Sequence, residues 1–407
     1  MHNITSAWTE LLQQFLPIFT TPTGEVFIRL ITGWILCTAR RTVTGIVPFA
    51  DPLSLRTHDA YHRFFPNARW SMPRLWQTLA TILVRTFCRN GVITLALDDT
   101  LFHHSGRKVD GAAWWRDAVR STSKSIVYAW GLNLVVITLQ IQPLWGGEPL
   151  GLPVNMRLHR KNGPTLIELA MEMINEVRQW LPQRSYRVVG DGFYATLAGK
   201  DLDGVAIISR IKRNANLFDL PPKRKKKGRG RPRTKGKKLA KLEKMAAHIQ
   251  NWEKVTFRQR GKTIERLVYT RTVLWYKVSR KPILLVISRD PDRKEKDDFF
   301  FTTDSDGFEY DCRRGAGMLQ RQMGHRRHVQ KYQTASWRTT AADIQRQGTR
   351  TCGRPEPLAV LGGLAVVSQA KIQPKIFLCS AVVLSQDNPQ LCRCDSVPSP
   401  RALEGQN

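Results

Sequence analysis

The chain is short of acidic residues and lacks a long uninterrupted hydrophobic segment. Its 407 residues include 33 Asp and Glu against 64 Lys and Arg, which gives a formal net charge of +31. Such an imbalance favours a polyanionic partner, with nucleic acid the default, because Lys and Arg neutralise phosphates without regard to sequence. The best apolar stretch near the N-terminus, residues 26–36, is short and is interrupted by Arg29. We therefore expect no membrane span.

Paired cysteines and an N-terminal leader are also missing. The seven cysteines show no spacing that indicates disulfides, which favours a reducing compartment. Residues 1–14 are mixed polar, with no basic segment ahead of an apolar one, so we expect no signal peptide. With the basic charge, these features predict a cytoplasmic, nucleoid-associated protein.

Two apolar segments run directly into carboxylates. Residues 91–99 read GVITLALDD and end on Asp98 and Asp99, and residues 187–191 read RVVGD and end on Asp191. Burying a charge is costly unless it is paired or binds metal, so these acids are expected at the open end of a sheet. Acids at strand ends also cap turns, and the pattern alone leaves both interpretations open.

The order of predicted elements indicates an α/β fold, in a chain long enough for two or three domains. Residues 1–90 carry apolar side chains near helical spacing. We expect them to form either a helical bundle with a solvated basic face or a DNA-reading domain. Residues 91–219 predict several strands, a helix that Pro164 starts and further strands. This order is that of an RNase H-like core, a mixed sheet with flanking helices, with Asp99 and Asp191 on neighbouring central strands. The predicted strands of this region are 91–99, two segments within 124–142, 150–158, 186–190 and 205–211, and the helix is 166–181.

Two carboxylates at such strand ends could share Mg²⁺ or Mn²⁺ ions. Mg²⁺ prefers hard oxygen ligands and keeps several waters. In phosphoryl transfer, a pair of ions about 4 Å apart activates the attacking oxygen and stabilises the leaving one.

The residues around these acids resemble the DDE transposases of bacterial insertion sequences. The resemblance covers residues 90–306 and rests on LDDT at 97–100, HHSGRK at 103–108, GAAWW at 111–115, GGEP at 146–149 and DGFY at 191–194. It implies that three acids bind two metal ions, hydrolyse double-stranded DNA at the transposon end and join its 3′-OH to target DNA. Asp99 matches the first acid and Asp191 the second. Asp98 is either an alternative first ligand or a supporting, capping acid.

The resemblance implies a β-rich insertion after the second acid. Within residues 246–306, strands are predicted at 255–257, 265–269, 273–278 and 282–287, followed by a return strand near 299–303. A basic linker, residues 220–245, precedes them, and its charge repulsion and its Gly and Pro content predict disorder. RGRPR at 229–233 resembles an AT-hook, which lays arginines in a narrow minor groove; a generic phosphate-binding loop is the alternative. The expected DNA contacts are Lys223, Arg224, Lys225, Lys226, Lys227, Arg229, Arg231 and Arg233.

The third acid of that family is missing. Its helix, Tyr-x-x-Arg-Trp-x-Ile-Glu, should follow the Phe-Thr-Thr strand, yet the chain beyond about residue 306 loses helical periodicity and holds five of the seven cysteines. Read one base out of frame, the codons of Met323 and Gly324 contain TGG for Trp, and residues 319–327 permit the rest of the motif. We therefore expect residues 307–407 to be a poorly ordered, out-of-frame tail without the third ligand, for which Glu309 is a poor substitute.

Three functions remain open from the sequence. The first is a transposase for Mg²⁺-dependent cleavage and strand transfer, inactive as written, acting as a homodimer on DNA by resemblance. The second is a non-catalytic, truncated transposase that binds DNA and competes at transposon ends, and the third is an RNase H-like nuclease without strand transfer. Trp114, Trp115 and Arg116 are candidate DNA contacts, with buried packing as the alternative for the tryptophans.

Overall fold

The computed structural model describes most of the chain before the predicted tail. The described residues are 4–38, 41–106, 108–122, 124–142, 149–222, 233–259 and 262–304. They fall into two compact units. The helical unit holds the described residues within Met1–Leu75 and Ser105–Ala112, and the sheet unit holds those within Trp76–His104 and Ala113–Arg350. The tail, residues 307–407, lies outside the described residues.

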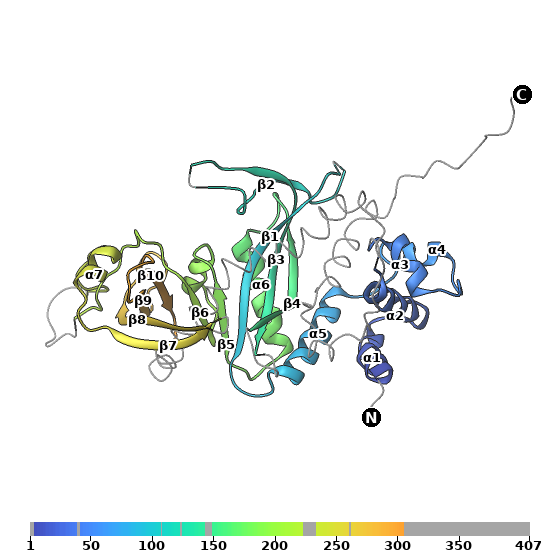
Figure 1. Ribbon diagram of the computed structural model, residues 1–407, viewed down its shortest axis with the longest axis horizontal. Coiled ribbons are helices and arrows are strands. Elements are labelled where there is room, and N and C mark those ends of the chain that lie inside the picture. Colours follow the sequence, from blue (N-terminus) through green and yellow to red (C-terminus); the bar gives the residue numbers. More distant parts are fainter. Residues whose placement is uncertain are drawn as a thin grey trace, which may run out of the picture. The chain divides into compact units, whose positions relative to one another are not determined.

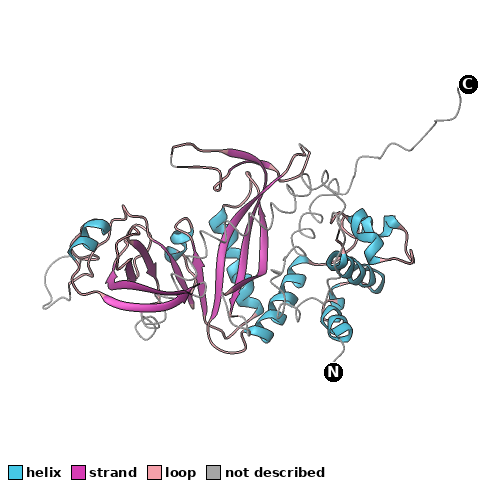
Figure 2. Ribbon diagram, in the orientation of Figure 1, coloured by secondary structure: helices cyan, strands magenta, loops and turns pink. Residues whose placement is uncertain are grey.

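The N-terminal region is helical, as predicted (Figures 1 and 2). Its helices are α1 (Ile4–Gln13), η1 (Leu16–Ile18), α2 (Thr21–Leu36), α3 (Val43–Ala50), α4 (His58–Arg63) and α5 (Met72–Phe87), the last of which continues into the sheet unit. Aromatic rings pack inside the helical unit: Phe19 stacks on Phe27 at a centroid distance of 4.6 Å, and Phe64 stacks on Trp70 at 5.7 Å. None of the described helices combines the length and the apolar character that a bilayer crossing requires.

One ten-stranded mixed sheet organises the sheet unit (Figure 2). Its strands are β1 (Ile93–His103), β2 (Ala113–Arg116), β3 (Tyr128–Ile141), β4 (Leu150–His159), β5 (Tyr186–Gly190), β6 (Val205–Arg210), β7 (Glu253–Gln259), β8 (Lys262–Val273), β9 (Ile283–Arg289) and β10 (Asp298–Thr302). The strand order is β2-β3-β1-β5-β6-β10-β9-β8-β7, with β4 paired to β3. The β1–β5 and β5–β6 pairs are parallel, and the other pairs are antiparallel. The fold is the predicted α/β, RNase H-like one.

Helix α6 (Leu166–Trp180) lies where the sequence predicts it but starts differently. Thr165 is its N-cap, and its side chain and that of Glu168 form a reciprocal capping box. Pro164 therefore precedes the cap and does not occupy the first turn. The predicted apolar face is buried, with Leu169, Ala170, Met173, Ile174 and Val177 inside.

Two strand predictions are wrong. The segment 124–142 holds one strand, β3, and not two, because the chain does not turn at Gly131: a Cβ on that residue would lie 2.0 Å from the Phe102 carbonyl oxygen. Glycine there allows β1 to approach closely. Residues 273–278 are not a strand, because the N–H groups of Val278 and Ser279 both donate to the Trp275 carbonyl, which turns the chain.

The strands after β6 continue the same sheet and curl back on it. Helix α7 (Leu242–His248) begins within the expected linker and leads into β7. Val255 and Phe257 of β7 share a buried cluster with Val189 of β5 and Ile208 of β6. The shared core shows that the far edge of the sheet packs against its middle (Figure 1).

Candidate active site

The predicted acids lie where the parallel ladder between β1 and β5 ends. Its last register pair is Ala96 with Val189. Strand β5 ends at Gly190, and Asp191 is the next residue. Asp98 lies two residues beyond Ala96, and Asp191 lies two residues beyond Val189. The acids thus lie just beyond the end of the β1–β5 ladder, with Asp98 and Asp99 inside β1 and Asp191 directly after β5.

Strand β1 does not stop at Asp99, contrary to the prediction. It continues to His103, because β3 still supplies hydrogen-bonding partners on its other edge and pairs Val135 with Asp99. Side chains alternate along a strand, so Asp99 shares the face of the buried Leu97, and Asp98 points to the opposite face. The Asp98 carboxylate accepts the Asp99 N–H at 2.9 Å, which fits the capping interpretation of Asp98.

Tyr194 contacts both predicted ligands. Its hydroxyl donates to Asp99 Oδ1 at 3.3 Å, and its backbone N–H donates to Asp191 Oδ1 at 3.4 Å. The side chain is 1% exposed. Burial, and then the negative charges of Asp99 and Asp98, raise the pKa of Tyr194 far above its ordinary value, so its hydroxyl remains a donor. Tyr194 belongs to the DGFY motif at 191–194, but its contact with Asp99 does not follow from the sequence.

The turn after β5 is built to hold this tyrosine. Asp191 Oδ1 accepts the Phe193 N–H at 2.8 Å, and the Asp191 carbonyl accepts the Ser209 hydroxyl at 2.5 Å. A Cβ on Gly190 would lie 2.9 Å from the Tyr194 Cβ, closer than side chains tolerate. Glycine before the acid therefore allows Tyr194 to pack against the strand end.

The donor set fits a hard cation. Asp98, Asp99 and Asp191 are all partly buried carboxylates, and oxygen ligands of this kind suit Mg²⁺ or Mn²⁺ rather than softer metals. Within the described ranges, no group of three His, Cys, Asp or Glu side chains is gathered as a metal site. Among the described residues, Asp99 and Asp191 each contact Tyr194, and Asp98 adjoins Asp99.

The predicted DNA contacts fall largely outside the described residues, since only Arg233 of the eight is described, and it is exposed. Of the aromatic candidates near the site, Trp115 is half-buried, with its ring 4.6 Å from that of His159. Trp114 is 57% exposed, so buried packing is wrong for this residue: it lies on the outer face of a short edge strand.

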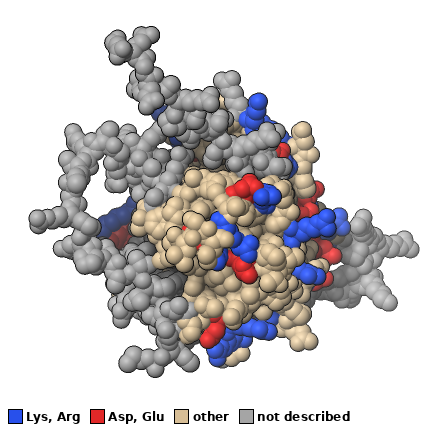
Figure 3. Space-filling model, turned by 90° about the vertical axis from the view of Figure 1, so that its right-hand side faces the viewer, with Lys and Arg blue, Asp and Glu red and all other residues tan. Residues whose placement is uncertain are grey.

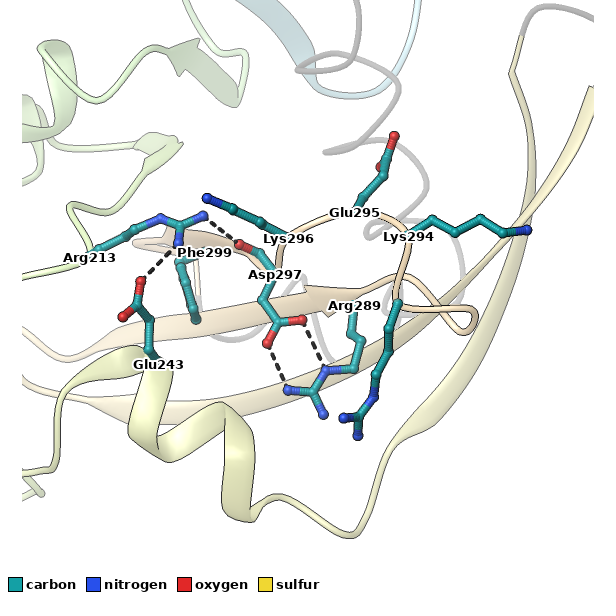
Figure 4. A pocket seen from close by; sticks show the side chains of 9 residues that line it. Arg213, Glu243, Arg289, Lys294, Glu295, Lys296, Asp297 and Phe299 are labelled. Atoms are coloured by element: carbon teal, nitrogen blue, oxygen red, sulfur yellow. Dashed lines mark hydrogen bonds and ion pairs between the residues drawn. The ribbon is translucent and has the colours of Figure 1, made fainter. Parts of the chain in front are cut away.

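A basic pocket lies away from the acids, among the strands that follow β6 (Figure 4). Its carboxylates are held by arginines: Asp297 binds Arg289 through two hydrogen bonds of 2.9 and 2.7 Å, and Glu243 binds Arg213 at 2.8 Å. These ion pairs fix the loop before β10. They make the pocket a structural feature rather than a second metal site.

A family model described as DDE superfamily endonuclease matches residues 14–282, about two thirds of the chain. The match spans both acids and most of the curled sheet. No curated protein matches the chain.

Proposed function

The chain belongs to the DDE superfamily endonucleases, and on that premise we propose a transposase site for Mg²⁺-dependent cleavage of transposon-end DNA and strand transfer. We propose further that the polypeptide as written binds DNA without cutting it. The observation that carries the site assignment is the convergence of Asp99 and Asp191 on Tyr194 at the end of the β1–β5 ladder.

Each residue has a distinct role in this proposal. Asp99 and Asp191 hold the metal ions, which when bound would activate the attacking oxygen and stabilise the leaving one. Asp98 supports Asp99 by accepting its N–H. Tyr194 orients both carboxylates, and its hydroxyl gives no proton away because burial and the two neighbouring charges keep it protonated.

The proposed loss of cleavage rests on the missing third acid. The Phe-Thr-Thr segment is present, with its Phe and first Thr as the last two residues of β10, but no Tyr-x-x-Arg-Trp-x-Ile-Glu motif follows it. A reading frame displaced by one base permits that motif in the codons of residues 319–327. Two carboxylates hold two metal ions less completely than three, so positioning of the reacting phosphate should fail before binding of DNA does.

The partner in this proposal is double-stranded DNA, at transposon ends and at target sites. The net charge of +31 supports it. The tract containing Lys223, Arg229 and Arg231 would bind DNA phosphates regardless of base sequence. A homodimer on DNA would bring two transposon ends together, and association with the nucleoid would follow from binding of DNA by so basic a chain.

A strand-cleavage assay tests the proposal. The substrate is plasmid DNA carrying the segments that flank the gene, and the readout is Mg²⁺-dependent nicking alongside a gel shift without metal. The chain as written should shift the DNA without nicking it. A chain returned to the alternative frame near codon 306 should nick it, and Asp191→Ala should abolish that nicking.

The matched control is Asp203→Ala, which removes an acid of the same unit that is 82% exposed and should leave nicking unchanged. Nicking by the chain as written that Asp191→Ala abolishes would contradict the proposed inactivity. Resequencing codons 290–370 separately decides whether the frame recorded here is the gene's own.

The missing third acid also favours the second candidate, a truncated transposase that competes at transposon ends. In that case the chain as written should inhibit the frame-restored chain in a mixture, in proportion to the DNA it occupies. A nuclease without strand transfer is distinguished by its products, which would include nicked DNA but no joined DNA.

A further inference from the structure

A short ribbon beside the candidate site exposes aromatic side chains. This aromatic ribbon, residues 113–130, comprises β2, the connecting loop and the beginning of β3. Of the ten large apolar side chains exposed among the described residues, four lie in it: Trp114, Val119, Ile126 and Tyr128. Exposed apolar side chains gathered in one place mark an interaction site.

The ribbon places its aromatic and basic side chains on one face. Trp114 pairs with Trp130, and Arg116 pairs with Tyr128; since side chains alternate along strands, all four point to the same side. The Trp114 and Trp130 rings meet edge to face at 6.0 Å. Trp114 is 57% and Tyr128 59% exposed, so more than half of the surface of each residue is accessible to a ligand.

The charge of the ribbon is positive. Arg116, Arg120 and Lys124 are exposed, whereas its one acid, Asp117, is 2% exposed. Two copies of such a face would repel each other, which argues against a second copy of this chain as the occupant. Exposed aromatic rings interleaved with basic side chains suit a nucleic acid with unpaired bases.

The ribbon has a fixed distance from the candidate site. Strand β3 carries both, since Val135 lies opposite Asp99 and Trp130 belongs to the ribbon. Five residues of strand span about 17 Å. That length corresponds to about five base-pair steps of DNA, in which ten steps span about 34 Å.

We propose that the aromatic ribbon binds DNA through unpaired bases, which stack on Trp114 and Tyr128 about five nucleotides from the phosphate at Asp99. The inference rests on the proposed function for its choice of DNA as partner. Bases within an intact duplex present only their edges, so a ring face can stack only where pairing is broken. Arg116, opposite Tyr128 on the same face, contacts the backbone of the same strand of DNA.

The test measures binding of the full chain as written to two labelled DNAs by fluorescence anisotropy, in EDTA. One probe is a blunt 20-base-pair duplex (on the order of two helical turns), and the other is the same duplex with about five unpaired nucleotides at one 3′ end. The ratio of the affinities for the two probes cancels the contribution of the basic tract, because the tract binds the phosphates of both.

The unchanged chain should prefer the overhang. Trp114→Ala should weaken overhang binding about tenfold, the scale of one lost base–aromatic stack, and change blunt-duplex binding less than about threefold. Tyr128→Ala should act in the same direction, and Trp114→Phe, which keeps a ring face, should retain the preference. Leu53→Ala, which trims an exposed apolar side chain of the helical unit, should have no effect on either probe.

Three outcomes overturn the proposal: no overhang preference in the unchanged chain, equal losses on both probes, or a change in oligomeric state alone on Trp114→Ala. The last would assign the ribbon to contacts between copies. The binding measurement needs neither metal nor cleavage, so the two proposals can fail separately. If the frame-restored chain cannot nick DNA but the overhang preference is present, the proposed activity is rejected and the role of the ribbon is retained.

Discussion

Two loops of this molecule are each organised by a buried aspartate, yet they expose different side chains. The loop after α3, residues 51–56, folds around Asp51, and the aromatic ribbon folds around Asp117. Each of these acids is almost fully buried. Each accepts two backbone N–H groups from the residues that follow it and a side-chain hydrogen bond from elsewhere in its unit.

The two loops differ in how charge is compensated around them. Asp51 binds Arg29 at 2.8 Å, and Arg56 pairs with Glu25, so basic side chains of the helical unit are matched by acids. Figure 3, viewed toward the right-hand side of Figure 1, shows Lys and Arg lying beside Asp and Glu. In the ribbon Arg120 pairs with the buried Asp117 at 3.3 Å, and the exposed Arg116 and Lys124 lie near exposed aromatic side chains. The comparison teaches that a buried aspartate shapes a loop, whereas the surrounding charges decide what the loop can bind.

Breaking the Asp51 anchor should give the largest effect. Asp51→Asn leaves Arg29 facing a neutral group in a partly buried setting, and loss of one partner of such a pair is strongly destabilising. We expect the thermal midpoint to fall by roughly 10 °C. The matched control is Asp59→Asn, since Asp59 forms an exposed helix ion pair with Arg63; its midpoint should move by no more than about 2 °C. Equal shifts for the two variants would contradict the anchoring role.

Asp117→Ala should open the ribbon locally. It removes an acceptor from the N–H groups of Val119 and Arg120 and from His103. We expect about 2 kcal/mol of lost protection in hydrogen exchange at these two amides, with exchange in α6 unchanged. Asp117→Asn keeps an acceptor oxygen and should lose less. Uniform deprotection across the sheet would show that the ribbon is not a separate, locally opening element.

Gly190→Ala tests a third turn, the one after β5, which is shaped by side-chain packing and not by a buried aspartate. The added Cβ would lie 2.9 Å from the Tyr194 Cβ, so the tyrosine must move away from Asp99, at a cost of about 1–3 kcal/mol in unfolding free energy. Gly192→Ala is the control, because its Cβ would meet the Arg210 carbonyl at an ordinary 3.5 Å. A destabilisation by Gly192→Ala as large as that by Gly190→Ala would show that steric crowding at Tyr194 is not the cause.

Acid should affect both anchored loops. Burial, the largest influence on each carboxyl, raises its pKa, but hydrogen bonds from the following backbone, and nearby Arg29 or His103, leave the pKa of Asp51 and of Asp117 below the ordinary value. A carboxyl group whose pKa is lowered by folding stabilises the protein fully at pH values above its pKa in the unfolded chain, about 3.9. This stabilisation is lost as the pH falls through the pKa of the folded protein. Amide signals of residues 55–56 and 119–120 should therefore change together below about pH 4. Retention of the Val119 and Arg120 signals at pH 2 would contradict the account.

Much of this arrangement could be predicted from the chain. Apolar runs that end in acids located Asp99 and Asp191, and helical spacing with a closing proline located α6. Strand register and side-chain exposure could not be predicted, because they depend on partners distant in sequence. Strand β1 continues past Asp99 because β3 pairs with it, and the single strand within residues 124–142 depends on the close approach of Gly131 to Phe102. Tyr194 was missed because its role lies in a contact across 95 residues.

The central claim is that Asp99 and Asp191 form one metal site. It is tested most directly by loading the full chain with Fe²⁺ in place of Mg²⁺ and mapping where ascorbate and peroxide cleave the polypeptide. The account predicts cuts in two places, near residues 97–100 and near 190–194, both suppressed by excess Mg²⁺ and both lost in Asp191→Ala. Cuts at only one of these segments, or cuts that persist in Asp191→Ala, would contradict a shared site.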